Sequence, residues 1–272
     1  MIQVASVSGL FSTIVWLIFV LVGLYVYAAL VRQINARIPA PELQEPAPRD
    51  FGVPELGVAL VLISFLLLNV FASATATSNR LSSGDLVANL VLSVVVLLIL
   101  IGFLELRRLH VDRMAGLSRY GIVRSIVTGA SLLLAAYPLI SLADLLTRTV
   151  EGSSTRQNIV ELFSGSHTIQ QRILIIVLAV AVAPIAEEFV FRFFLYGVLR
   201  RFIGRLPSLV FTALLFAAVH AHLPSFAPLF VLAVCFTLAY EWSGSILVSM
   251  TMHSLFNSLS LFFLAFPGLS DQ

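Results

Sequence analysis

Three groups of polar residues interrupt long apolar stretches of this chain, and their side chains are of kinds that do acid–base chemistry. The groups are Glu187, Glu188 and Arg192; Phe216 and His220; and His253 and Asn257. A carboxylate can take a proton from water, and imidazole and amide groups can donate hydrogen bonds to a developing oxyanion. A charged side chain near the centre of a membrane helix costs about 2.5–3.5 kcal/mol. We therefore expect these residues to pair with one another or to line a cavity within the protein.

Glu187 is the best candidate for a general base in the first group. Glu188 and Arg192 are four residues apart, the spacing at which a carboxylate and a guanidinium meet on one helical face. A purely structural ion pair explains those two residues equally well. Glu187 is rotated by about 100° from Glu188, away from that partner. Pro184, three residues earlier, removes a backbone hydrogen bond and is expected to kink or open the helix beside the site.

The second and third groups supply imidazole and amide groups. His220 shares a helical face with Phe216, whereas His222 falls nearly opposite, close to the helix end, and is better explained as an interfacial residue. Polar residues recur every four positions along the last apolar run: Ser245, Ser249, His253 and Asn257. Hydrogen bonds between helices explain the two serines, but a histidine and an asparagine together in mid-span indicate a site.

The depth of these residues supports one common site. Counted along their own apolar runs, Glu187, His220, His253 and Asn257 lie nine to thirteen residues from the ends that face the same side. At about 1.5 Å per residue, all four lie roughly 14–20 Å from one membrane surface. Structural polar residues scattered through a bundle would not be expected to share a depth.

The composition indicates a membrane protein. Of 272 residues, 59% are hydrophobic and only 11% are charged, whereas soluble domains carry roughly 25% charged residues. Backbone groups in lipid must be paired internally, so apolar runs of membrane-crossing length predict α-helices. Eight such runs cover residues 6–31, 57–77, 86–105, 126–146, 172–199, 207–222, 226–241 and 244–266. We predict an all-α, polytopic transmembrane bundle of about eight spans.

The distribution of charge predicts the topology. All 16 basic residues are arginine and the net charge is only +2, which gives no footprint for nucleic acid. Eleven arginines follow the odd-numbered runs and four lie on the other side. The positive-inside rule therefore places both termini outside and the arginine-rich stretch 107–124 at the cytoplasmic interface. The chain has one cysteine, Cys235, so an intrachain disulfide is impossible.

The three motifs resemble those of a known family. Residues 187–192 fit the pattern EExxxR, residues 216–220 fit FxxxH and residues 253–257 fit HxxxN. In this order on separate apolar helices, they resemble the type II CAAX prenyl endopeptidase and bacteriocin-processing (CPBP, ABI) family of intramembrane glutamate proteases. The resemblance covers residues 126–266, which we take as a peptidase core. Residues 1–125 then hold the N-terminal transmembrane helices and the basic interfacial segment, and residues 267–272 form a C-terminal tail.

The resemblance implies an endopeptidase that needs no cofactor and that cleaves a protein or peptide within the membrane. The implied roles are water activation by Glu187 and His220, oxyanion stabilisation by His253 and Asn257, and substrate binding or shaping of the site by Glu188, Arg192 and Phe216.

Two other functions stay open on the residues alone. Glu187, His220 and His253 could bind zinc with water in an open position, although the zinc-peptidase motif HExxH is absent. The chain could instead be a non-catalytic membrane scaffold or a proton-relay transporter, because intramembrane Glu and His can pass protons. Transport is less favoured, since the sequence has no visible inverted repeat.

The substrate and the cellular setting are less constrained. The expected partners are a protein or peptide substrate and the lipid bilayer, with no nucleic acid, and the oligomeric state is undetermined. A composition with arginine and no lysine favours a multi-pass protein of the bacterial inner membrane. There the resemblance points to maturation of secreted peptides, C-terminal sorting signals or bacteriocin-related functions. A prenylated substrate requires an organism that prenylates proteins.

Overall fold

The computed structural model describes residues 7–36, 51–75, 83–119, 121–151 and 168–266, and its regular structure in these segments is entirely helical. The long helices are α1 (Val7–Ala36), α2 (Val53–Thr75), α3 (Ser83–Leu106), α5 (Ile122–Glu151), α10 (Arg205–Val219), α11 (Phe226–Ser243) and α12 (Ile246–Ala265). Another long helix changes its hydrogen-bonding pattern along its length and consists of α7 (Ile169–Val177), the π-helical η1 (Leu178–Val182), α8 (Ala183–Glu188), the π-helical η2 (Phe189–Leu195) and α9 (Tyr196–Ile203). The short elements are α4 (Val111–Met114) and the 3₁₀ turn η3 (Leu223–Ser225).

Each of the eight predicted apolar runs coincides with a long helix, when α7 to α9 are taken as one. Within the described residues, six helices are long and apolar enough to cross a membrane, while α10 and the apolar part of α3 (Leu90–Leu106) are shorter. Large apolar side chains on the outer helices are exposed, among them Phe11, Tyr25 and Phe71 at 68–72%. Such a surface suits contact with lipid. The predicted all-α, polytopic transmembrane fold is confirmed.

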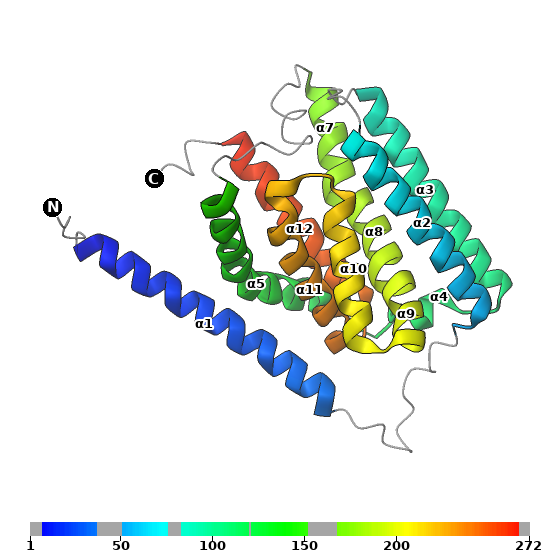
Figure 1. Ribbon diagram of the computed structural model, residues 1–272, viewed down its shortest axis with the longest axis horizontal. Coiled ribbons are helices and arrows are strands. Elements are labelled where there is room, and N and C mark those ends of the chain that lie inside the picture. Colours follow the sequence, from blue (N-terminus) through cyan, green and yellow to red (C-terminus); the bar gives the residue numbers. More distant parts are fainter. Residues whose placement is uncertain (1–6, 37–50, 76–82, 120, 152–167, 267–272) are drawn as a thin grey trace.

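The helix from α7 to α9 lies inside the bundle (Figure 1). Helices α2 and α3 lie along one of its flanks, and α10, α11 and α12 lie on the other. Helix α5 packs against α11 and α12, and α1 crosses over α5 and α11 on the outside. The crossing of α1 over α5 depends on Gly23, because a Cβ at this position would overlap the carbonyl oxygen of Ala135. The helix from α7 to α9 (Ile169–Ile203), which we call the central helix, is therefore covered by protein on both sides.

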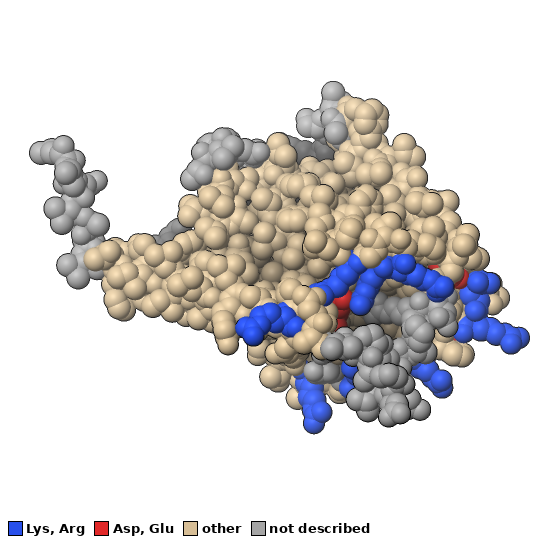
Figure 2. Space-filling view, turned by 60° about the horizontal axis from the view of Figure 1, so that its bottom comes forward, with Lys and Arg blue, Asp and Glu red and all other residues tan. Residues whose placement is uncertain are grey.

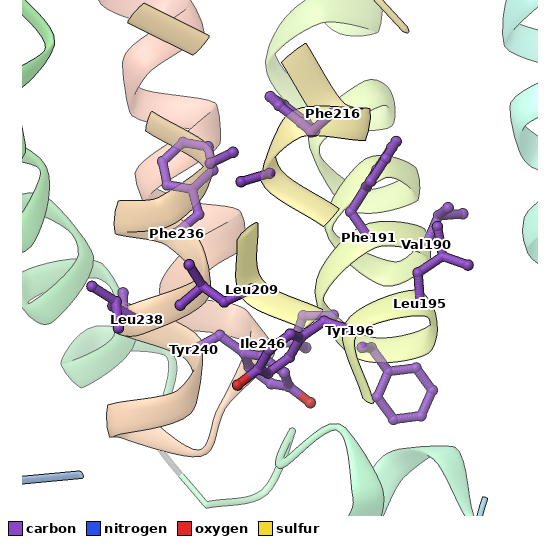
Figure 3. Close-up of a cluster of buried hydrophobic side chains, with 14 of the residues drawn as sticks. Val190, Phe191, Leu195, Tyr196, Leu209, Phe216, Phe236, Leu238, Tyr240 and Ile246 are labelled. Atoms are coloured by element: carbon purple, nitrogen blue, oxygen red, sulfur yellow. The ribbon is translucent and has the colours of Figure 1, made fainter. Parts of the chain in front are cut away.

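The apolar core surrounds η2 and the start of α9. Every residue from Phe189 to Leu199 is buried, as expected for a helix that is apolar on all sides. Figure 3 shows side chains from η2 and α9 meeting side chains from α10, α11 and α12. Phe51, just before α2, is fully buried, and its ring meets those of Phe193 and Phe194 edge to face at 5.9 and 6.1 Å. The core thus fixes the helix that carries the EExxxR motif.

Arginines gather at one end of the bundle (Figure 2). This end holds the C-terminal ends of α1, α3 and α9 and the N-terminal ends of α2, α5 and α10. Two of these arginines pair with the same buried carboxylate, that of Glu241 in α11. Its Oε1 lies 2.8 Å from Arg200 Nη1 and its Oε2 lies 2.9 Å from Arg205 Nε. This uneven distribution of arginines between the two ends matches the one from which the topology is predicted. The assignment of this end to the cytoplasm stays a prediction.

The arginine-rich stretch 107–124 is attached to the bundle, and its described residues contain one helical turn, α4, before α5 begins. Val111 and Ala115 are buried, and the Ala115 carbonyl accepts a 3.0 Å hydrogen bond from the backbone N–H of Ile246. At the other side of the stretch, Arg107 donates from Nε to the fully buried carboxylate of Glu55 at 2.9 Å. The stretch therefore joins α2 and α3 to the first residue of α12.

This junction makes Gly116 sensitive to substitution. Gly116 has φ +67°, and a Cβ there would overlap the carbonyl oxygen of Gly244, at the turn between α11 and α12. Backbone strain alone costs about 1–3 kcal/mol for a residue other than glycine in this conformation. We expect Gly116→Ala to lower the free energy of unfolding by more than this, because of the added clash. Gly204→Ala tests backbone strain without a clash, because Gly204 has φ +83° and ψ 174°, a region restricted to glycine, but open space around it. A loss for Gly116→Ala that is no larger than the strain alone, measured by denaturation in detergent, would contradict a role for the Gly116–Gly244 contact.

Candidate active site

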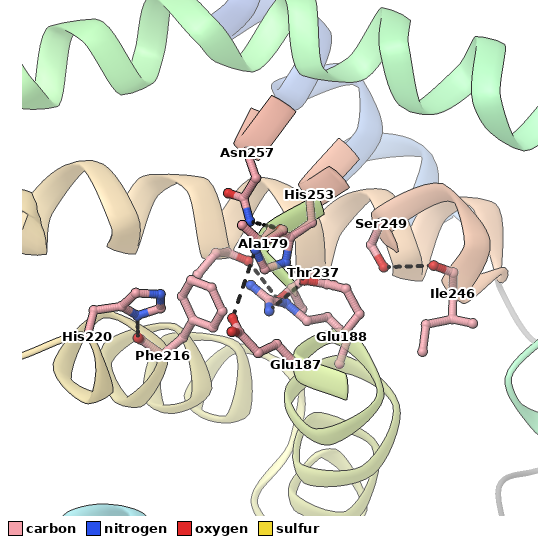
Figure 4. Close-up of polar contacts among 12 residues, drawn as sticks. Ala179, Glu187, Glu188, Phe216, His220, Thr237, Ile246, Ser249, His253 and Asn257 are labelled. Atoms are coloured by element: carbon pink, nitrogen blue, oxygen red, sulfur yellow. Dashed lines mark hydrogen bonds and ion pairs between the residues drawn. The ribbon is translucent and has the colours of Figure 1, made fainter. Parts of the chain in front are cut away.

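The three polar groups meet where the central helix, α10, α11 and α12 come together (Figure 4). Their positions are Glu187 and Glu188 at the end of α8, Arg192 in η2, Phe216 in α10, His220 directly after α10, and His253 and Asn257 in α12.

π-Helical turns flank the two glutamates on both sides. The N–H of Ala183, at the end of η1, donates to the carbonyl of Leu178, five residues back, and the N–H of Tyr196 after η2 does the same to Phe191. Such turns are rare and occur frequently at functional sites. Pro184 lies in the first turn of α8, so the local opening that this proline predicts takes the form of the π-turns of η1.

Glu188 is the centre of a buried polar cluster. Its Oε1 lies 2.9 Å from Arg192 Nη1 and 2.9 Å from His253 Nδ1. All three side chains are buried, with at most 4% of each exposed. The ion pair predicted from the spacing of Glu188 and Arg192 is therefore confirmed. Since Glu188 acts as an acceptor here, His253 Nδ1 carries a hydrogen, and Nε2 is the nitrogen that faces the rest of the site.

Aromatic rings enclose this cluster. The Arg192 guanidinium carbon lies 4.3 Å from the ring centroid of Phe216 and 5.1 Å from that of Phe236. The same two rings lie 5.9 and 5.1 Å from the imidazole of His253. Cation–π contacts of this kind strengthen when the cation is desolvated. Phe236 is a site residue that the sequence did not reveal, since it is one of many apolar residues in α11 and forms part of no motif.

Glu187 is more accessible than its neighbour and makes no ion pair with an arginine of the described segments. Its side chain is 31% exposed, and its Oε2 lies 3.9 Å from His253 Nε2. Within the described part of the chain, this oxygen accepts no hydrogen bond. Glu187 therefore has an unshared acceptor facing the imidazole that Glu188 orients.

His220 lies at the edge of the site. Its Nδ1 is 2.7 Å from the carbonyl oxygen of Phe216, and its ring packs on the Phe216 ring with centroids 4.8 Å apart. A carbonyl can only accept, so Nδ1 carries a hydrogen and Nε2 is free to accept one. In the described residues Glu187 Oε2 faces the His253 imidazole, with 3.9 Å between Oε2 and Nε2. The pairing of Glu187 with His220 stays a prediction.

Asn257 lies one helical turn beyond His253 and contacts the central helix. Its Nδ2 donates to the carbonyl oxygen of Ala179, in η1, at 2.7 Å. Of the two serines in the same polar stripe, Ser249 donates to the carbonyl of Ile246 at 3.1 Å, and Ser245 lies directly before the helix. His222 lies outside α10, where its Nδ1 is 2.7 Å from the hydroxyl of Ser225.

The donors for a metal ion do not converge. Among the described residues, no group of three or more His, Cys, Asp or Glu side chains is arranged to hold a metal. The zinc set of Glu187, His220 and His253 would require His220 to move toward the other two. We therefore assign no step to a metal.

Residues 169–259 match the family model described as type II CAAX prenyl endopeptidase Rce1-like. This part of the chain is therefore similar to an Rce1-like domain. It extends from the start of α7 into α12 and contains all three motifs. The resemblance found in the sequence is thus confirmed over residues 169–259, and the bounds 126–266 of the peptidase core stay a prediction. No curated protein and no solved structure gives a significant match to the chain. The Rce1-like domain indicates that this multi-pass membrane protein is a protease.

Proposed function

We propose that the protein is an intramembrane glutamate endopeptidase in which Glu187 is the general base. The observation that carries the proposal is the pair formed by Glu187 Oε2 and His253 Nε2, 3.9 Å apart. Both atoms are close enough to contact the same water molecule. Within the described residues, the Glu187 side chain is 31% exposed and its buried Oε2 has no hydrogen-bond partner, whereas the buried Glu188 is occupied by Arg192 and His253.

The reaction needs one water and one peptide bond. Glu187 takes a proton from the water, with His220 Nε2 helping to orient it, and the hydroxide attacks the scissile carbonyl carbon. The carbonyl electrons move to oxygen, and the tetrahedral intermediate then expels the amide nitrogen. The proton on Glu187 passes to that nitrogen, which completes the leaving amine and restores the carboxylate.

His253 and Asn257 are the proposed donors to the oxyanion. His253 already donates from Nδ1 to Glu188, so donation from Nε2 requires the imidazolium form. Asn257 has a second amide hydrogen beside the one that bonds Ala179. Such preorganised donors typically contribute about 10²–10³ in rate.

The test is direct cleavage. The purified protein is reconstituted in liposomes with membrane-anchored peptides, both with and without a C-terminal prenylated cysteine, and products are identified by mass spectrometry. We expect cleavage by the wild type and none by Glu187→Ala. Equal turnover by both proteins contradicts the proposed mechanism. pH-dependent proton uptake without cleavage favours a proton relay. The absence of both cleavage and proton uptake favours a non-catalytic scaffold. The two peptide classes show whether the substrate is prenylated.

The geometry also predicts a response to chelation. Because the described carboxylate and imidazole groups form no metal site, turnover is expected to persist after dialysis against a strong chelator. Zinc content is measured in the same sample by elemental analysis. Loss of activity that added zinc restores would support the zinc peptidase instead.

A further inference from the structure

The hydrogen bond between Asn257 and Ala179 depends on an irregularity in the backbone of the central helix. In an α-helix the Ala179 carbonyl would accept from the N–H of residue 183, and in a π-helix from that of residue 184. The N–H of Ala183 is bonded to the carbonyl of Leu178. Residue 184 is proline and has no N–H. Neither helical donor therefore serves the Ala179 carbonyl.

The Asn257 side chain takes the place of the missing backbone donor. Ala179 is 7% exposed, and a buried carbonyl without a partner costs free energy. Asn257 Nδ2 donates to this oxygen at 2.7 Å. The bond fixes the direction of the amide plane and leaves one N–H for another acceptor. It also ties α12, which carries His253, to the helix that carries Glu187 (Figure 4).

We propose that Pro184 is a positioning residue of the active site: because it lacks an N–H, it keeps the Ala179 carbonyl available to orient the amide of Asn257. The inference rests on the proposed function for its catalytic consequence, but the pairing of the two residues can be tested without activity. A residue with an N–H at position 184 competes with Asn257 for the same oxygen and releases the amide.

The experiment is a double-mutant cycle of Pro184→Ala and Asn257→Ala in the full chain in liposomes. Asn257→Ala is expected to lower kcat by about 10²–10³-fold, as loss of an oxyanion donor does. Pro184→Ala is expected to lower kcat by about 10–100-fold, the scale of a small misplacement in a reacting site. In the Asn257→Ala background, Pro184→Ala should cause no further loss. Pro138→Ala removes a proline within α5 and should leave kcat unchanged.

The melting temperature gives a second readout, in which Pro184→Ala is expected to cause a gain rather than the loss expected in kcat. Asn257→Ala leaves the Ala179 carbonyl without a partner, and Pro184→Ala supplies one, so the proline substitution should raise the melting temperature of Asn257→Ala. A drop in kcat of the same size in both backgrounds, or a melting temperature that falls in both, overturns the proposal. If Asn257→Ala keeps full activity, the oxyanion role fails, while the stability cycle still decides the pairing.

Discussion

Glu187→Gln is expected to lower kcat by about 10²–10⁴-fold, the usual contribution of a general base. The amide has the shape of the carboxylate but cannot take a proton from water. The fold should tolerate the change, because the Glu187 side chain is 31% exposed and its Oε2 accepts no hydrogen bond within the described residues. KM and melting temperature should therefore stay close to wild type. Single-turnover cleavage in liposomes measures the loss.

Glu105→Gln is the matched control for this substitution, since Glu105 is an exposed residue at the end of α3, away from the three motifs. It should retain wild-type turnover. If Glu187→Gln also retains turnover, the base lies elsewhere. If it loses turnover together with the fold, as judged by melting temperature, the assignment of Glu187 as an accessible, unpaired carboxylate is wrong.

Arg192→Met is expected to destabilise the protein by about 3–5 kcal/mol, the cost of removing one partner from a buried ion pair. Glu188 is fully buried, and without Arg192 its charge would keep only His253. Methionine retains an apolar, polarisable chain between the rings of Phe216 and Phe236. The effect is therefore assigned to the uncompensated carboxylate rather than to lost packing. Denaturation in detergent, followed by helical circular dichroism, measures it.

The double variant Glu188→Gln/Arg192→Met separates charge from packing. It should lose much less stability than Arg192→Met alone, because no buried charge is left without its partner. Arg201→Met, on the exposed end of α9, should stay within about 0.5 kcal/mol of wild type. Equal losses for the single and double variants would show that the guanidinium acts through its contacts with the rings.

Hydrophobicity and spacing predicted the helices and one ion pair because both depend on local rules. An apolar run in lipid has to be helical, and residues four apart share a helical face. Glu188 and Arg192 follow that rule directly. The bond from His253 to Glu188 joins residues 65 positions apart, and only the packing of α12 on α8 brings them together. Spacing along the chain carries no information about that contact.

The backbone of the site departs from regular helical geometry, and the residue types predict only part of this departure. The run predicted to continue to residue 222 ends as a helix at Val219, and Ala221 then adopts φ +48°. Glycine or asparagine usually signals such a helix end, and alanine does not. His220, directly before Ala221, keeps a helical backbone conformation, and its ring still shares a face with that of Phe216. The π-turns of η1 and η2 likewise have no signature beyond Pro184.

The bond from Ile246 to Ala115, at the first residue of α12, has a consequence for how this chain can be divided. The stretch with family resemblance begins at Ile169, but α12 is held at its start by the segment before α5 and along its length by α5 itself. A fragment that began at Ile169 would lose both supports and expose the helix that carries His253. The stretch that matches the family model is therefore shorter than the packed unit that supports α12, and a fragment that keeps both supports has to begin no later than Val111.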